Sequence, residues 1–159
     1  MKRNFFIALI LAVISFNGFS QARGGFSLAV LIPNAGSLEG DPVGVGFYGN
    51  YEHDITKKLN FVAETGWANW SRMNADGSAG EVENLNTISV TGGLKYNLFK
   101  PIYLEGRTGY YFSGIDQFVV IPAVGLRIWK IDANLGANVM GDVPFINFRL
   151  GIFFLEKKN

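Results

Sequence analysis

Apolar and polar residues alternate from Phe26 to Phe154 in about eight successive segments, and the polar positions carry nearly all of the charge. Side chains along a β-strand point alternately to opposite faces, so each segment predicts a strand with one apolar and one polar face. Only helices and closed barrels satisfy every backbone hydrogen bond inside a bilayer. The pattern therefore predicts an all-β fold, an eight-stranded antiparallel up-and-down transmembrane β-barrel.

The first twenty residues have the features of an export signal that is later removed. Lys2 and Arg3 are positive, and the apolar run 5–16 is broken only by Ser15 and is too short for a typical spanning helix. Residues 17–20 (Asn-Gly-Phe-Ser) place small side chains before a cleavage point after Ser20. We predict a signal peptide at 1–20 and one outer-membrane β-barrel domain at 21–159. The alternative is a retained N-terminal anchor helix.

The composition narrows the class of protein further. Without Lys2 and Arg3 the formal charge falls from +1 to −1, and a near-neutral chain without a basic cluster is not expected to bind nucleic acid. There is no cysteine, which excludes disulfides, thiolate metal sites and a lipoprotein anchor. After the signal, no run of about 18 apolar residues predicts a spanning helix. The aromatic content of 14% and the many glycines are ordinary for a membrane barrel.

Eight strands are expected, most of them near or above the length of about 9–11 residues with which a tilted strand crosses the hydrocarbon. Their approximate ranges are 25–32, 43–55, 59–72, 85–98, 102–112, 118–129, 131–140 and 145–154. The connections 33–42 and 73–84 are long and 113–117 is intermediate, whereas 56–58, 99–101, Lys130 and 141–144 are short. Long connections at one end and short turns at the other are typical of membrane barrels, whose short turns face the periplasm.

The polar face of the strands holds five acids and five bases. Lys or Arg on the lipid face would cost about 2–4 kcal/mol each near the bilayer midplane. Inside a narrow barrel the charges can pair, and an eight-stranded barrel is just wide enough for side chains to fill it. We therefore expect a filled interior; a soluble barrel of the lipocalin kind, with its apolar face inside, is the alternative. The ten charges are Glu52, Asp54, Glu64, Arg72, Lys95, Glu105, Arg107, Arg127, Asp132 and Arg149.

Eight of these charges form the predicted site, an interior charge network with a structural role. They are Glu52, Glu64, Lys95, Glu105, Arg107, Arg127, Asp132 and Arg149.

Aromatic residues gather near both ends of the predicted strands, as in the interfacial girdles of membrane barrels. One girdle is Tyr51, Tyr96, Phe99, Tyr103 and Trp129; the other is Trp67, Trp70, Tyr110, Tyr111, Phe112 and Phe118. Core and edge aromatics of a soluble β-sandwich are the alternative interpretation. Pro122 lacks the N–H that a closed barrel needs, so we expect a bulge there or a strand that begins at Pro122.

The whole chain after the signal resembles the small outer-membrane β-barrel proteins of the OmpA-like and OmpX-like architecture, and in particular the short barrel-domain proteins of Bacteroidetes-type bacteria. The resemblance is carried by the signal end Phe19-Ser20-Gln21-Ala22, by turn segments such as Tyr51-Glu-His-Asp-Ile-Thr-Lys-Lys-Leu59, and by the final strand 145–154. It implies an outer-membrane location, with membrane lipid and the barrel assembly machinery as partners.

Some barrels of this size are enzymes that act on lipid A through Ser, His and an acid, and such a hydrolase needs a base beside its nucleophile. The single histidine, His53, falls on the apolar face near a short turn, so we interpret it as an interfacial residue. Glu64, Glu105 and Asp132 could form a carboxylate site, but interior salt bridges are the favoured interpretation. No catalytic residue is predicted.

Two further patterns are interpreted as structural. Residues 74–78 (Asn-Ala-Asp-Gly-Ser) lack the spaced acids and terminal Glu of a calcium loop. The glycines at 44, 46, 92 and 93 are followed by no helix, so they do not predict a nucleotide site and instead mark tight packing. No metal and no cofactor is predicted.

The expected function is a structural or surface-interaction role exerted through the long connections. A narrow channel for small solutes or ions is the first alternative. A lipid-modifying enzyme and a soluble ligand-binding barrel are the others. The sequence does not predict which ligand the long connections bind.

Overall fold

The computed structural model describes residues 22–33, 43–71, 85–113, 116–139 and 144–156. The predicted signal peptide lies outside the described residues and stays a prediction. No helix in the described part of the chain is long and apolar enough to cross a membrane. The described residues form eight β-strands: β1 (Ala22–Pro33), β2 (Val43–Asp54), β3 (Leu59–Ser71), β4 (Leu85–Phe99), β5 (Ile102–Phe112), β6 (Gln117–Ile128), β7 (Ile131–Asn138) and β8 (Phe145–Glu156).

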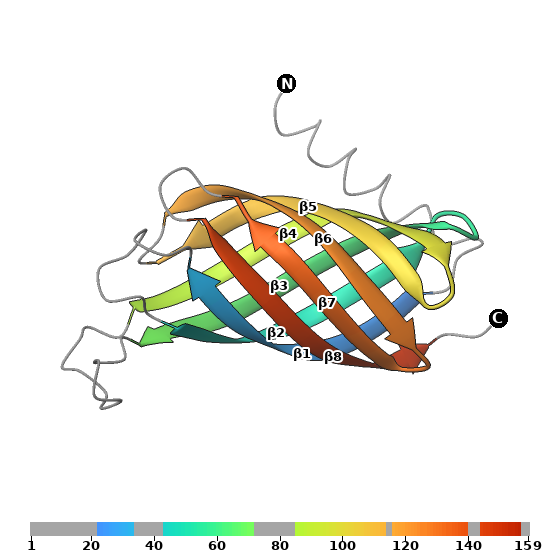
Figure 1. Cartoon of the computed structure of the whole chain (residues 1–159), viewed down its shortest axis with the longest axis horizontal. Coiled ribbons are helices and arrows are strands. Elements are labelled where there is room, and N and C mark those ends of the chain that lie inside the picture. Colours follow the sequence, from blue (N-terminus) through green and yellow to red (C-terminus); the bar gives the residue numbers. More distant parts are fainter. Residues whose placement is uncertain (1–21, 34–42, 72–84, 114–115, 140–143, 157–159) are drawn as a thin grey trace, which may run out of the picture.

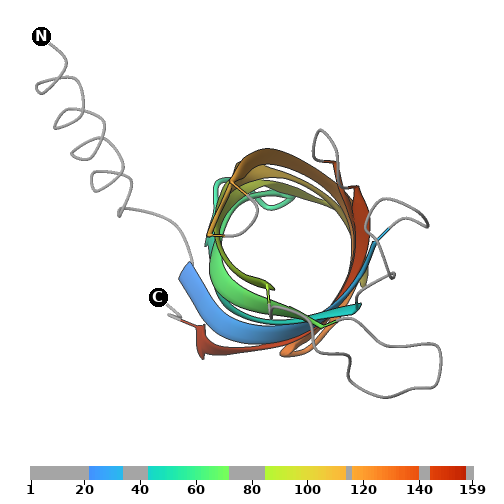
Figure 2. The same ribbon diagram turned by 90° about the vertical axis from the view of Figure 1, so that its left-hand side faces the viewer.

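The strands form one closed barrel in chain order, and every neighbouring pair is antiparallel. The first and last strands close the ring, with Phe26 opposite Ile152 and Leu28 opposite Leu150. Figure 1 shows the tilted strands from the side, and Figure 2 looks along the barrel. The predicted eight-stranded antiparallel barrel is confirmed, and the predicted strand bounds agree to within a few residues.

The two ends of the barrel differ in their connections. At the short-turn end, β2 meets β3 through residues 55–58, β4 meets β5 through 100–101, and β6 meets β7 through 129–130. Thr56 Oγ1 accepts hydrogen bonds from the Leu59 and Lys58 N–H groups at 3.0 and 3.3 Å, which holds the first of these turns. The other four connections leave from the opposite, long-connection end. Because the number of strands is even, Ala22 and Glu156 both lie at the short-turn end.

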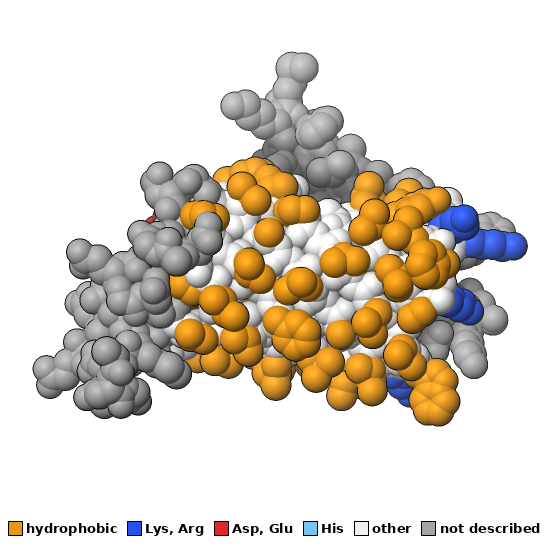
Figure 3. All heavy atoms as spheres, viewed as in Figure 1, with side chains coloured by type: hydrophobic (Ala, Val, Ile, Leu, Met, Phe, Trp, Pro, Cys, Tyr) orange, Lys and Arg blue, Asp and Glu red, His pale blue; other side chains and the backbone are white. Residues whose placement is uncertain are grey.

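The alternation of faces follows the predicted parity. Outward side chains such as Leu94 and Phe148 are each 49% exposed, whereas Lys95, the neighbour of Leu94, is only 2% exposed. Figure 3 shows apolar side chains covering the visible wall of the barrel, with Lys and Arg side chains gathered at the short-turn end. The wall is therefore apolar outside and charged inside.

The expectation for Pro122 is wrong. β6 passes through Pro122 without a bulge, in continuous register with β5. The ladder between β6 and β7 is interrupted instead: Val120 and Val139 exchange hydrogen bonds of 3.1 and 2.8 Å, and pairing resumes in the same register at Ala123 and Gly136. The ring nitrogen of Pro122 falls on the β7 side of the strand, so only this ladder lacks a bond.

The girdle prediction is wrong for three aromatic residues. Trp70, Tyr103 and Tyr111 are at most 3% exposed and point into the barrel. Trp70 has the same parity as Glu64 along β3, and both tyrosines have the parity of Glu105 along β5. All three residues lie near strand ends, but side-chain alternation, not closeness to an end, determines the face on which they lie. The remaining girdle aromatics are exposed: Tyr51, Tyr96, Phe99 and Trp129 near the short turns, and Trp67, Tyr110, Phe112 and Phe118 towards the other end.

Candidate functional site

The candidate site is the ion-paired interior of the barrel, which we call the lumen. Seven of the eight predicted network residues are at most 7% exposed, and the Arg127 side chain, at the short-turn end, is 17% exposed. Every strand from β2 to β8 contributes at least one of them, because each charge sits on the inward parity of its strand. Asp54 lies at the end of β2, and Arg72 lies outside the described residues.

Glu52 is the acceptor on which the short-turn half of the network converges. Its carboxylate oxygens lie 2.8 Å from Arg127 Nη2, 2.9 Å from Lys95 Nζ and 2.8 Å from Arg23 Nη1. Asn60 Nδ2 also donates to it at 2.5 Å. Four donors from four different strands thus meet one buried carboxylate, which ties opposite sides of the barrel together.

Asp132 is the second acceptor of this half. Arg127 Nη2 lies 2.7 Å from it, Lys95 Nζ 3.5 Å, and the Tyr103 hydroxyl donates to it at 2.6 Å. Aromatic rings cover two of the cations: Lys95 Nζ is 4.0 Å from the Tyr103 ring centre and Arg127 is 4.2 Å from that of Phe153.

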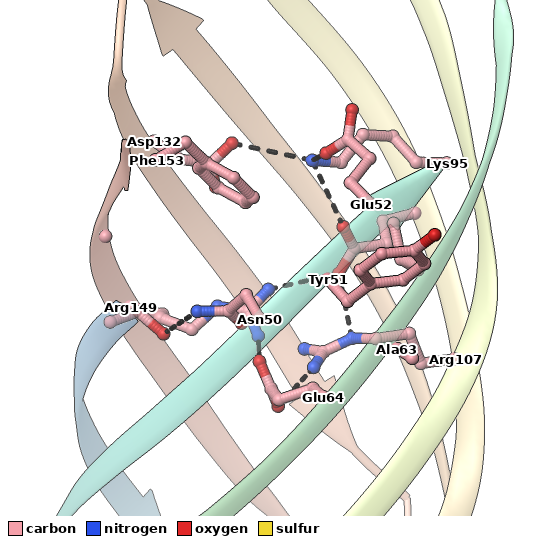
Figure 4. A pocket seen from close by; sticks show the side chains of 14 residues that line it. Asn50, Tyr51, Glu52, Ala63, Glu64, Lys95, Arg107, Asp132, Arg149 and Phe153 are labelled. Carbon is pink, nitrogen blue, oxygen red and sulfur yellow. Dashed lines mark hydrogen bonds and ion pairs between the residues drawn. The ribbon is translucent and has the colours of Figure 1, made fainter. Parts of the chain in front are cut away.

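Further inside the barrel, Glu64 and Glu105 alternate with two arginines. Arg107 and Arg149 both form ion pairs with Glu64. Glu105 forms ion pairs with the same two arginines, at 2.8 Å from Arg107 Nε and 3.1 Å from Arg149 Nη2. Lys95 links this group to the first half, because its Nζ lies 3.6 Å from Glu105. Figure 4 shows Glu64, Arg107 and Arg149 projecting from separate strands towards one another.

Arg23 is a network residue that the sequence prediction missed. It lies in β1, which begins three residues earlier than predicted, and it forms ion pairs of 2.8 Å with both Glu52 and Asp54. Its parity matches that of Ser27 and the other inward residues of β1, so extending the alternation backwards would have found it. With Arg23 the described lumen holds five acids and five bases.

The half of the lumen towards the long connections holds a cluster of buried apolar and aromatic side chains. The Trp70 and Phe145 rings meet edge to face with centres 4.9 Å apart, and the Tyr111 ring lies 6.0 Å from that of Phe145. Leu31, Ile121 and other buried apolar side chains complete this cluster. The lumen thus consists of an ion-paired half and a half built around this apolar cluster, stacked along the barrel axis.

The geometry leaves little free space in the lumen. A cavity of about 20 Å³ lies among the network charges, and one of about 10 Å³ lies between them and the apolar cluster. A single water needs roughly 10–15 Å³ of such space, so each cavity holds about one water molecule. In the part of the chain that the structure describes, no group of three or more His, Asp or Glu side chains is arranged to hold a metal ion.

The remaining sequence candidates form no further site among the described residues. His53 stacks against Tyr51, and its Nδ1 lies 3.4 Å from the Tyr51 hydroxyl on the outer face. The carboxylates of Glu64, Glu105 and Asp132 are each ion-paired to arginine or lysine. The segment 74–78 lies outside the described residues. The glycines at 44 and 46 pack closely against the rings of Trp70 and Tyr48.

The sequence matches no known family model and no curated protein. The structure, however, is similar to solved transmembrane β-barrels, which defines its fold class. Ail, the attachment invasion locus protein of Yersinia pestis, in complex with the heparin analogue sucrose octasulfate, has a TM-score of 0.57 at 15% identity, over 85% of this chain and 99% of Ail.

Two further solved structures share this fold. The Yersinia pestis outer membrane protein Ail in a phospholipid bilayer nanodisc has a TM-score of 0.53 at 14% identity, over 84% of this chain and 99% of that one. A de novo designed transmembrane β-barrel has a TM-score of 0.56 at 10% identity, over 83% and 95%. These similarities establish the fold that this chain shares with outer-membrane proteins.

Proposed function

We propose that this protein is a non-enzymatic outer-membrane β-barrel, with lipid against its apolar wall and a closed, ion-paired lumen as its structural core. Its long connections would face the outside of the cell and carry a surface-interaction role. The barrel assembly machinery would place it in the membrane after export. The similarity to Ail in a bilayer nanodisc supports this proposal at the level of fold.

The observation that carries the proposal is the inside-out distribution of charge. Lys95 and Arg107 are buried at 2–3% exposure inside the barrel, whereas Leu94 and Leu126, on the outer wall, are 49% and 42% exposed. In water this arrangement would leave a large apolar surface unprotected. Against hydrocarbon it is favourable, because the closed ring leaves no unpaired backbone edge.

The charge of the long connections bears on the partner that they would contact. Their sequence holds seven acids and one base. Ail was solved with a polyanionic heparin analogue. The acidic sequence here would repel such a ligand, so we propose a cationic surface partner for this chain. The charged residues are Glu39, Asp41, Arg72, Asp76, Glu81, Glu83, Asp116 and Asp142.

Arginine substitutions at two depths of the same outer face test the membrane placement. Leu94 lies five residues before the end of β4, and Ile128 is the last residue of β6. If the wall faces lipid, Leu94→Arg destabilises the folded barrel by about 2–4 kcal/mol and Ile128→Arg by about 0–1 kcal/mol. The measurement is reversible unfolding in phospholipid vesicles, followed by heat-modifiable migration on gels, with Leu94→Phe as the apolar control.

A soluble barrel would give a different result. Leu94 and Ile128 would then both face water, and the two arginine variants would fold equally well without detergent. That outcome, or recovery of the wild-type protein in the soluble fraction after cell lysis, would reject the membrane assignment. Extraction only by detergent is the result that we expect.

A further inference from the structure

Every short turn of the barrel carries lysine. Lys57 and Lys58 lie between β2 and β3, Lys100 between β4 and β5, and Lys130 between β6 and β7. All four side chains are exposed, whereas every other Lys or Arg in the described strands is buried or half-buried. The exposed positive charge of the described barrel therefore lies at one end, as Figure 3 shows at the short-turn end.

These lysines surround a pocket of about 590 Å³ at the mouth of the barrel. Arg23 and Arg127 also line it, which gives six cations around one carboxylate, that of Glu52. Glu52 is already paired with both arginines and with Lys95, so it does not neutralise the exposed lysines. Cations outnumber carboxylates among the lining residues, so the chemistry of the pocket suits an anion such as a phosphate group.

Apolar side chains lie directly beside this positive charge. Phe99 and Trp129 line the same pocket and are 63% and 96% exposed. Trp129 has a φ of 56°, a left-handed conformation that a bulky residue rarely adopts. The turn thus holds a tryptophan outwards, next to Lys130. Aromatic rings at headgroup level with adjacent lysines are the arrangement that a membrane interface favours.

We propose that this lysine-lined mouth binds the phosphate of anionic phospholipids in the leaflet at the short-turn end. The inference rests on the proposed membrane location, which places the short turns at the periplasmic leaflet. Lipid is favoured over a free anion because the pocket is walled by exposed aromatic residues as well as by cations, so that one ligand with a charged head and an apolar body satisfies both.

Trp129 provides a local probe of the lipids at this end. A variant with Trp67→Phe and Trp70→Phe leaves Trp129 as the single tryptophan. It is refolded into vesicles of equal parts phosphatidylglycerol and phosphatidylcholine, with one or the other lipid brominated to quench fluorescence. We expect quenching by the anionic lipid to exceed quenching by the zwitterionic lipid by about two- to threefold, because each lysine near the surface attracts anionic headgroups.

The matched control places the probe at the other end of the outer wall. Trp67 is 49% exposed on β3, away from the lysines, and a variant with Trp70→Phe and Trp129→Phe reports from there. The two lipids should quench Trp67 equally. Replacing all four lysines by glutamine in the Trp129 probe should bring its quenching ratio to one without changing total quenching.

The remaining outcomes show whether the pocket binds an anionic lipid, a soluble anion or neither of these ligands. Equal quenching of Trp129 by both lipids, or an anionic preference that persists without the lysines, would overturn the proposal. A saturable response of Trp129 to pyrophosphate in purely zwitterionic vesicles, without lipid preference, would assign the pocket to a soluble anion and also overturn it. Failure of the membrane assignment looks different, since neither tryptophan would then be quenched by any brominated lipid.

Discussion

Glu52 illustrates how the interior holds charge without water. The residue is fully buried, and three cations and an amide donate to its two oxygens. An ion pair inside a protein gives little net stability relative to an apolar pair, but removal of one partner leaves the other charge uncompensated. The stability of the short-turn half of the lumen therefore depends on this carboxylate more than on any single pair at the rim.

We predict that Glu52→Gln lowers the free energy of unfolding by about 3–5 kcal/mol, because it removes the charge that Arg127 and Lys95 share. Asp54→Asn is the matched control. The Asp54 side chain is 23% exposed and pairs with Arg23 at the rim, so its loss should cost about 0–1 kcal/mol. Urea unfolding in vesicles measures both, and equal losses would show that Glu52 is not the main acceptor.

At the scale of the strands, large interior rings lie opposite glycines of the next strand. Tyr103 on β5 faces Gly125 on β6, and Tyr48 on β2 faces Gly66 on β3. A Cβ built on Gly125 would lie 2.2 Å from the Tyr103 ring. The ring therefore occupies the space that a neighbouring side chain would otherwise take, and this pairing lets bulky residues fit into a narrow barrel.

The pairing predicts a difference between two glycines on neighbouring strands. Gly125→Ala should destabilise the barrel by about 1–3 kcal/mol, because the new methyl group displaces Tyr103 and its hydrogen bond to Asp132. Gly106→Ala, with no atom within 4 Å of its added Cβ, should change stability by at most about 0.5 kcal/mol.

Thermal or urea unfolding of the two alanine variants compares them directly. In a Tyr103→Ala background the cost of Gly125→Ala should disappear, because the added methyl group then has no aromatic ring to displace. An undiminished cost in that background would mean that the glycine is needed by the backbone rather than by the ring.

Side-chain alternation was enough to predict the strands and their closure into a barrel. It was not enough where two signals competed. Trp70 and Tyr111 resembled girdle residues because they lie near strand ends, although their parity placed them inside. The missing N–H of Pro122 affects only the ladder between β6 and β7. This effect can be recognised only when the neighbouring strands of β6 are known. The partners of Glu52 could not be predicted either, because alternation fixes the direction of a side chain and not its height across the ring.

At the scale of the whole molecule, the lumen is closed in two different ways. Ion pairs fill the half near the short turns, and Trp70, Tyr111 and Phe145 fill the other half. A solute that crosses the barrel would have to displace both the ion pairs and the aromatic side chains. Ionic conductance measures directly whether the lumen is closed.

We predict that the refolded protein in planar bilayers gives no steady ionic conductance in concentrated KCl. Because the charged half remains filled, the double variant Trp70→Ala with Tyr111→Ala should also remain closed. Heat-modifiable migration confirms that each sample is folded before it is measured. A stable, ohmic current from the wild-type barrel would reject the closed lumen and favour the narrow channel.

The seam between β1 and β8 bears on how such a wall can be built. It joins Phe26 to Ile152, and the bond between Glu52 and Arg127 spans 75 positions. Neither the ring nor the pairing of its charges can form while the chain is still being synthesised, since the last strand leaves the ribosome last. The apolar outer wall and the ion-paired interior therefore become complete only after the whole chain has been made, when β8 reaches β1.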